Sequence, residues 1–174
     1  MKAALLALTL LVAAVPGAVA REAPRPPAAT LAAERIGAGT LRWFGLQVYD
    51  AALWAPRRPF DAAASFVLVL RYARALEGGR IATRSIDEIA RLEASSEAQR
   101  QDWGEALRAL LPDVAPGDLL AGEHRPGRGV RFWLNGRPIG EIADPAFARA
   151  FFAIWLDARS SAPALRAALL GVAP

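Results

Sequence analysis

An arginine beside aromatic residues is the feature of this sequence best suited to holding an anionic ligand. Arg42 stands in the string TLRWFG, directly before Trp43 and Phe44. A guanidinium offers a rigid fork of N–H donors that fits a carboxylate or a phenolate. We therefore expect Arg42 to contact a ligand, with Phe44 in the same site. The competing interpretation is a strand arginine whose head group lies at the sheet edge in a surface ion pair.

Two tyrosines and one histidine are the other side chains that could do chemistry. Tyr49 and Tyr72 lie in apolar runs and could offer hydroxyl groups to a ligand, or could be core tyrosines with one satisfied hydroxyl. His124, the single histidine, stands beside a Pro-Gly turn and is expected to be an exposed turn residue. One histidine and no cysteine leave little room for a metal site, a catalytic triad or thiolate chemistry. We expect no metal and no cofactor.

The charge pattern excludes one class of partner. The formal net charge is +4, and the arginines are scattered along the chain. Nucleic-acid binding requires a clustered basic face, so we do not expect a nucleic-acid partner.

The first twenty residues predict export. Lys2 is followed by an apolar run over residues 3–15, then by Pro16-Gly17 and the small residues Ala18-Val19-Ala20. This is the pattern of a cleaved signal peptide, and the run is too short to span a bilayer. We expect a signal peptide over 1–20, a Pro-rich unstructured leader over 21–30 and one domain over 31–171. The mature protein would be periplasmic or secreted, without a membrane span.

The elements that must position these side chains follow from the hydrophobic pattern. Thr40 to Trp54 indicates one bent strand or two strands joined near Gly45, and the glycines at 37 and 39 indicate a tight turn or a close approach to a neighbour. Further strands are expected over 65–72, 118–123, 130–134 and 137–142, and helices over 81–92, 97–111, from 145 onward and over 163–170. Asn135-Gly136 predicts a type I′ hairpin turn. This order predicts an α+β fold, an antiparallel sheet with helices on one face.

Four strings in this order resemble the bacterial chalcone-isomerase-like proteins. They are GAGTLRWFGLQVYDAALW (37–54), LLPDVAPGD (110–118), GVRFWLNGRPIGEI (129–142) and FFAIWLDARSSAPALRAALLG (151–171). The resemblance implies an open-faced β-sandwich, in which a large antiparallel sheet is covered by a helical layer with a ligand cleft between them. Plant members close a flavanone ring in this cleft by adding a phenolate to an enone, whereas other relatives bind fatty acids.

The resemblance also tests the catalytic positions. Arg42 matches the family's arginine, which would make it the catalytic residue if the protein is an enzyme. By this resemblance Ile81 and Glu88 occupy the positions of the family's tyrosine and asparagine, and the family's threonine is not matched at Trp43-Phe44. Isoleucine has no hydroxyl, and glutamate repels an anion. We therefore expect a non-catalytic binder of a small amphipathic anion, a fatty acid or a phenolic compound. The alternatives are an intramolecular lyase acting on an enone, and a protein partner that uses exposed aromatic surface.

Overall fold

One antiparallel sheet organises the molecule. The computed structural model describes residues 22–28, 30, 33–92 and 95–172, so the expected signal peptide lies outside the described residues. Six strands stand in the sheet in chain order, each antiparallel to its neighbours. They are β1 (Glu34–Trp43), β2 (Leu46–Ala55), β3 (Phe66–Tyr72), β4 (Leu119–Arg125), β5 (Gly129–Leu134) and β6 (Arg137–Ile142).

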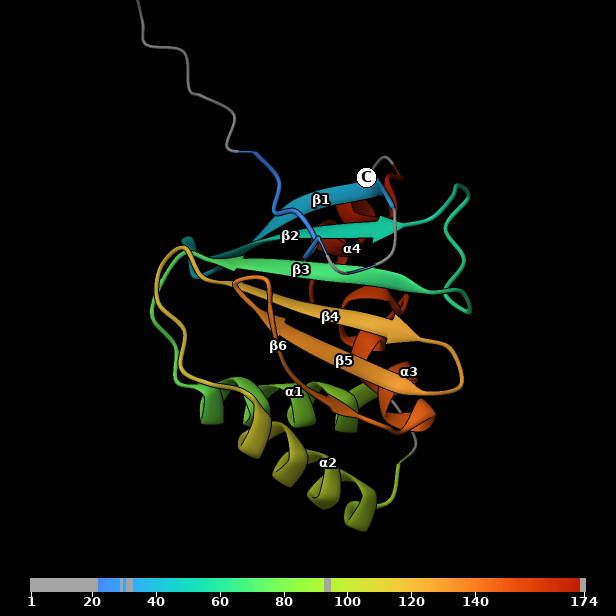
Figure 1. Ribbon diagram of the computed structural model, residues 1–174. Coiled ribbons are helices and arrows are strands. Elements are labelled where there is room, and N and C mark those ends of the chain that lie inside the picture. Colours follow the sequence, from blue (N-terminus) through green and yellow to red (C-terminus); the bar gives the residue numbers. More distant parts are fainter. Residues whose placement is uncertain (1–21, 29, 31–32, 93–94, 173–174) are drawn as a thin grey trace, which may run out of the picture.

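Helices cover one face of this sheet (Figure 1). They are α1 (Gly78–Leu92), α2 (Glu97–Leu110), α3 (Pro145–Leu156) and α4 (Pro163–Leu170). Helix α4 lies against β1 and β2, α3 against β5, α1 against α3, and α2 against α1 and β6. The α+β fold with helices on one face of an antiparallel sheet is confirmed. No helix in the described part of the chain is long and apolar enough to cross a bilayer.

The first hairpin shows what the early glycines do. The expected run from Thr40 to Trp54 forms two strands that meet at a turn over Phe44-Gly45, and β1 begins earlier, at Glu34. A Cβ atom at Gly37 would lie 2.1 Å from the carbonyl oxygen of Ala168 in α4. These glycines therefore permit close approach of a helix rather than a turn, which is why α4 can pack directly on the strand.

Alternation along the strands divides the apolar side chains between two faces. Val130 and Phe132 of β5 are buried on the helical side, in the main core, whereas Trp133 belongs to a small cluster on the other face. The N-terminal segment contributes to that other face (Figure 1). Pro24 is buried, and its carbonyl oxygen accepts a hydrogen bond of 3.0 Å from the Trp54 indole. The described part of the Pro-rich leader thus lacks helix and strand but is packed at Pro24.

Candidate functional site

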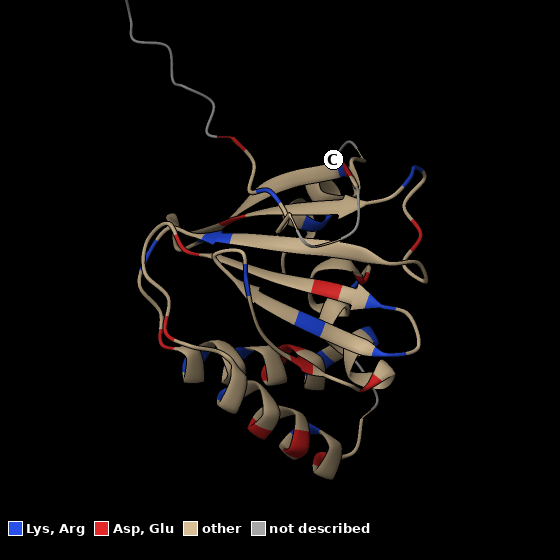
Figure 2. Cartoon of the chain, viewed as in Figure 1, with Lys and Arg blue, Asp and Glu red and all other residues tan. Residues whose placement is uncertain are grey.

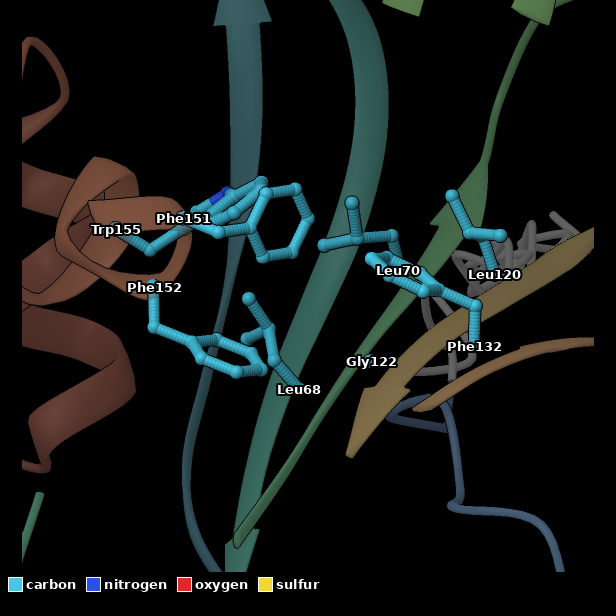
Figure 3. A pocket seen from close by; sticks show the side chains of 8 residues that line it. All are labelled: Leu68, Leu70, Leu120, Gly122, Phe132, Phe151, Phe152 and Trp155. Carbon is cyan, nitrogen blue, oxygen red and sulfur yellow. The ribbon is translucent and has the colours of Figure 1, made fainter. Parts of the chain in front are cut away.

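A small apolar cavity lies between the sheet and α3. It has a volume of about 20 Å³, enough for one water molecule at most. Its walls are Leu68, Leu70, Leu120, Gly122 and Phe132 from the sheet and Phe151, Phe152 and Trp155 from α3. The aromatic side chains of α3 reach toward the leucines of β3 (Figure 3), and only this small volume remains open between them.

The cavity is bounded on one side by a hydrogen-bonded aromatic pair. The indole N–H of Trp155, whose ring lines the cavity, donates to the Tyr49 hydroxyl at 2.9 Å. The Tyr72 ring meets the Tyr49 ring edge-on, with the ring centres 5.9 Å apart. Strand pairing causes this contact, because Tyr49 of β2 stands opposite Tyr72 of β3. The two tyrosines that the sequence singled out are therefore neighbours in the structure.

Burial fixes the protonation state of both tyrosines. Burial raises the pKa of Tyr49 to about 12, although the hydrogen bond from Trp155 opposes the change. The negative charge of Glu88 raises this pKa further, while the Arg84 guanidinium lowers it. Burial also raises the pKa of Tyr72 well above its usual range. At neutral pH each hydroxyl keeps its proton, so Tyr49 can both accept from Trp155 and donate to another group.

A buried carboxylate on α1 lies close enough to act on Tyr49. Glu88 is only 5% exposed. Its Oε2 accepts hydrogen bonds from Arg91 Nη2 at 2.8 Å and Nε at 3.1 Å, and its Oε1 accepts from the Ser161 hydroxyl at 3.0 Å and from Arg84. Burial alone would raise the pKa of Glu88, but these hydrogen bonds and the two arginine charges outweigh it, so the pKa lies below its usual value. The carboxylate stays ionised.

The charges of this group do not cancel. Two guanidinium groups face one carboxylate, which leaves one net positive charge. Arg84 also stacks over the Trp43 ring, 5.8 Å from its centre, and its side chain is mostly exposed. We call Tyr49, Arg84, Glu88, Arg91 and Trp155 the polar cluster. It combines a neutral hydroxyl donor with a surplus positive charge, and the ring of its Trp155 lines the apolar cavity.

Arg42 and Phe44 lie elsewhere. Both are exposed at the turn between β1 and β2, where Arg42 Nη1 donates to the carbonyl oxygen of Gly45 at 3.3 Å. Neither residue lines the cavity. Of the four ligand-binding residues expected from the sequence, the structure brings together Tyr49 and Tyr72 and leaves Arg42 and Phe44 at the surface. The arginine whose charge lowers the pKa of Tyr49 is Arg84.

Sequence reasoning missed part of the polar cluster. Arg84, Glu88 and Arg91 are spaced by four and three residues, which places them on one side of α1 and could have indicated a shared ion pair.

His124 was expected at an exposed turn, but it lies inside β4, partly buried and stacked on Phe66 with the ring centres 4.8 Å apart. Its Nδ1 is 2.8 Å from the carbonyl oxygen of Ala64. His124 is therefore a packing residue, and strand pairing with Phe66 is the reason.

Comparisons with known proteins agree on the fold. A family model described as chalcone isomerase-like matches residues 34–171. Among solved structures, a fatty-acid binding protein of Arabidopsis thaliana matches with a TM-score of 0.66 at 11% sequence identity, covering 84% of this chain and 90% of that one. At this identity the likeness shows the fold alone. No curated protein matches the sequence.

Proposed function

The chain belongs to the chalcone isomerase-like family, and we propose that it is an exported, non-catalytic binder of a small amphipathic anion, either a fatty acid or a phenolic compound. The observation that carries this proposal is the placement of the polar cluster beside an apolar cavity between sheet and helices. A ligand with an apolar body and an anionic head group requires both an apolar cavity and a group of cationic and hydrogen-bond-donating side chains. The similarity of the fold to a fatty-acid binding protein supports the same ligand class.

The head group of the ligand would meet the polar cluster. The Tyr49 hydroxyl is un-ionised and has a proton to donate, and Arg84 carries part of a charge surplus that Glu88 does not neutralise. Hydrogen bonds between a guanidinium and a carboxylate are among the stronger ones in proteins. In this proposal Arg84 takes the role that the sequence suggested for Arg42.

The body of the ligand would have to displace side chains. Pockets for small ligands typically hold about 300 Å³ or more, whereas this cavity holds about 20 Å³. Phe151 and Phe152 on α3 occupy the space that an aliphatic chain or a second ring would need. Binding should therefore reorganise the aromatic side chains of α3, and the near-ultraviolet circular dichroism of the protein should change when ligand is added.

The lyase alternative lacks two hydrogen-bond donors that the family resemblance would place on α1. Ring closure needs an ionised phenolate beside a cation and donors for a developing enolate. Glu88, at the helix position that the resemblance gives to the family's asparagine, is an ionised carboxylate and donates no hydrogen bond to a developing enolate. Ile81, at the position of the family's tyrosine, is partly buried against the core and offers only hydrocarbon.

Export is part of the proposal and rests on residues 1–20. The apolar run, the Pro16-Gly17 break and the small residues before Arg21 support cleavage after Ala20. N-terminal sequencing of the protein purified from its host tests this point. A start at Arg21 supports export to the periplasm or beyond, and a start at Met1 contradicts it.

Ligand binding is tested by native mass spectrometry and calorimetry. Protein purified from its own host should carry a bound organic acid, and stripped protein should bind a long-chain fatty acid more tightly than the matching fatty alcohol. Tyr49→Phe and Arg84→Gln should each weaken fatty-acid binding about five- to tenfold, since each removes one hydrogen bond to the head group. Arg84→Gln should also abolish the preference for acid over alcohol.

A cavity-filling variant tests the place of the ligand. A Cβ atom at Gly122 would lie 3.4 Å from Phe152 Cζ, so Gly122→Ala adds a methyl group at the cavity wall and should weaken binding. Gly79→Ala is the matched control, because a Cβ atom there meets nothing within 4 Å. Protein that is always empty and has no affinity for fatty acids or phenolic acids contradicts the proposed function.

A further inference from the structure

The turn between β1 and β2 exposes a cluster of apolar side chains. Trp43 is 59% exposed, Phe44 90% and Leu46 56%. We call Trp43, Phe44, Gly45 and Leu46 the aromatic tip. In the described part of the chain only one other large apolar side chain is comparably exposed, Val172 at 54%. Single exposed apolar residues are ordinary, but three within four positions indicate a surface that is covered by something.

The backbone of the aromatic tip is strained at its first residue. Phe44 has φ +47° and Gly45 has φ +77°, which makes a two-residue type I′ turn between Trp43 and Leu46. Asn, Asp and Gly suit the first of these positions, whereas a bulky aromatic residue there is strained. Strain of this kind persists mostly where a side chain is needed at that place. Here it places the Phe44 ring at the outermost point of the hairpin.

Two arginines lie next to the aromatic tip, at an end of the sheet where basic and acidic residues both occur (Figure 2). Arg42 directly precedes it and donates to the carbonyl oxygen of Gly45. Arg84 reaches it from α1 and stacks over Trp43. Both arginines are exposed, although Arg84 also shares the buried carboxylate of Glu88. The tip therefore combines apolar rings at its point with guanidinium groups around its base.

We propose that the aromatic tip inserts into the surface of a lipid bilayer that carries anionic headgroups. The rings of Trp43 and Phe44 enter the boundary between headgroups and acyl chains, where tryptophan is enriched in membrane proteins. The guanidinium group of Arg42 contacts lipid phosphates, which arginine binds in a bidentate manner.

The shape of the tip favours a membrane over a protein partner. The side chains project from a two-residue turn, and a Cβ atom at Gly45 would meet nothing within 4 Å. Stable protein interfaces bury about 800 Å² on each partner around a fully enclosed centre, and three side chains on a protruding turn do not supply that area. A fluid bilayer surface adapts to a protruding tip. This inference does not depend on the proposed ligand, because vesicle binding can be measured with ligand-free protein.

Vesicle co-sedimentation tests the proposal. The protein should begin at Arg21, because the apolar run of residues 3–15 would itself enter bilayers, and every described strand and helix lies after residue 33. It should bind vesicles of phosphatidylcholine mixed with phosphatidylglycerol and bind vesicles of pure phosphatidylcholine more weakly. Added salt should reduce the difference between the two, because it screens exposed charges.

Substitutions in the tip separate its apolar and charged parts. Phe44→Asn should lower the affinity for mixed vesicles about tenfold, since burying a phenylalanine side chain accounts for at least that factor. Arg42→Glu should lower the preference for anionic vesicles about fivefold or more. Val172→Asn is the matched control. Val172 follows Gly171, which packs on Ile36 near the start of β1, far along the strand from the tip, and the change should leave binding unaltered.

Depth of insertion gives an independent readout. Bromine-labelled phosphatidylcholine in mixed vesicles should quench part of the tryptophan fluorescence, and Trp43→Phe should remove that quenching while the protein still binds. Phe44→Asn puts a residue that tolerates positive φ into the turn, so this variant should stay folded. The proposal is overturned if the native protein binds neither vesicle type, or if Phe44→Asn binds as well as the native protein. Tip-dependent self-association or protein capture without vesicle binding also overturns it.

Discussion

The sheet contains two turns with nearly the same backbone and very different side chains. The β1–β2 turn has Phe44 at φ +47° and Gly45 at φ +77°, and the β5–β6 turn has Asn135 at φ +50° and Gly136 at φ +81°. Both connect adjacent antiparallel strands through two residues. Since the strands alternate in direction, both turns lie at the same end of the sheet, on its opposite edges (Figure 1).

The first residue of each turn makes the difference. Asn135 Oδ1 accepts from the Leu119 N–H at 2.8 Å, and its Nδ2 donates to Asp118 at 2.9 Å. Phe44 packs its ring edge-on against Trp43, with the ring centres 5.2 Å apart, and is otherwise open to solvent. The β5–β6 turn is arranged for stability. The β1–β2 turn carries backbone strain and exposes an apolar surface, which the proposed insertion into a bilayer would use.

Placing phenylalanine at Asn135, the first residue of the β5–β6 turn, should have the largest effect on stability. Asn135→Phe removes two hydrogen bonds and places a ring in the left-handed region, so the free energy of unfolding should fall by about 2 kcal/mol after allowance for solvent exposure. Urea unfolding followed by circular dichroism measures it. Asn135→Gly, which keeps the backbone relaxed, should lose less. Equal losses in the two variants would show that strain contributes nothing at this position.

Gly45 and Gly136, the second residues of the two turns, should respond alike to substitution by alanine, because their backbone angles and surroundings are alike. A Cβ atom at Gly45 or at Gly136 meets nothing within 4 Å, so alanine adds only the cost of positive φ. Gly45→Ala and Gly136→Ala should each lower the free energy of unfolding by about 1 kcal/mol. Paired urea titrations make the comparison. A clear difference between the two variants would mean that the turns are not equivalent in backbone energetics, and would weaken the comparison.

The reverse exchange should stabilise the protein slightly. Phe44→Asn relieves about 1 kcal/mol of strain and loses about 0.5 kcal/mol from the Trp43–Phe44 ring pair, a net gain of about 0.5 kcal/mol. Thermal unfolding of the variant beside the native protein detects a gain of this size as a small rise in melting temperature. A variant that is less stable than the native protein would show that Phe44 contributes to folding rather than to an exposed surface.

The contrast between the turns also shows what the sequence could and could not predict. Asn135-Gly136 between apolar runs predicts its turn directly, because both residues favour positive φ. At the other turn, the strand-forming residues Trp43 and Phe44 conceal the break, and only Gly45 marks it. The start of β1 was missed because Gly37 and Gly39 show no strand pattern. Glycine is needed at these two positions because they contact α4, which lies more than a hundred residues later in the chain.

The candidate site, like the two turns, has one part that the sequence could predict and one part that it could not. Placing Tyr49 and Tyr72 in neighbouring apolar runs was within reach of the sequence, since strand composition is local. Their partner Trp155 is 106 residues from Tyr49, so only the fold brings the two together. Arg42 matched a family position in the sequence, but the turn leaves it in solvent. Arg84, on α1, lies near Tyr49 because the helical layer faces the tyrosines.

Acid should affect the two turns differently, and this is the smallest of the expected effects. Hydrogen bonds from the Ala115 backbone N–H and then from the Asn135 side chain lower the pKa of Asp118 below its usual 3.8. A lowered pKa in the folded state adds stability that is present above pH 3.8 and is lost as the pH falls through the folded value. Urea midpoints measured from neutral to acidic pH should therefore fall less steeply in Asn135→Gly than in the native protein.

The same pH series on Phe44→Asn completes the comparison. Phenylalanine has no hydrogen-bonding group in its side chain, so replacing it removes no partner of a carboxylate. The acid-induced fall in stability should match that of the native protein, offset only by the constant gain from relieved strain. If Asn135→Gly also keeps the native pH profile, then Asp118 is held by the Ala115 N–H alone, and the stability of the β5–β6 turn comes from the Asn135–Leu119 hydrogen bond without help from charge.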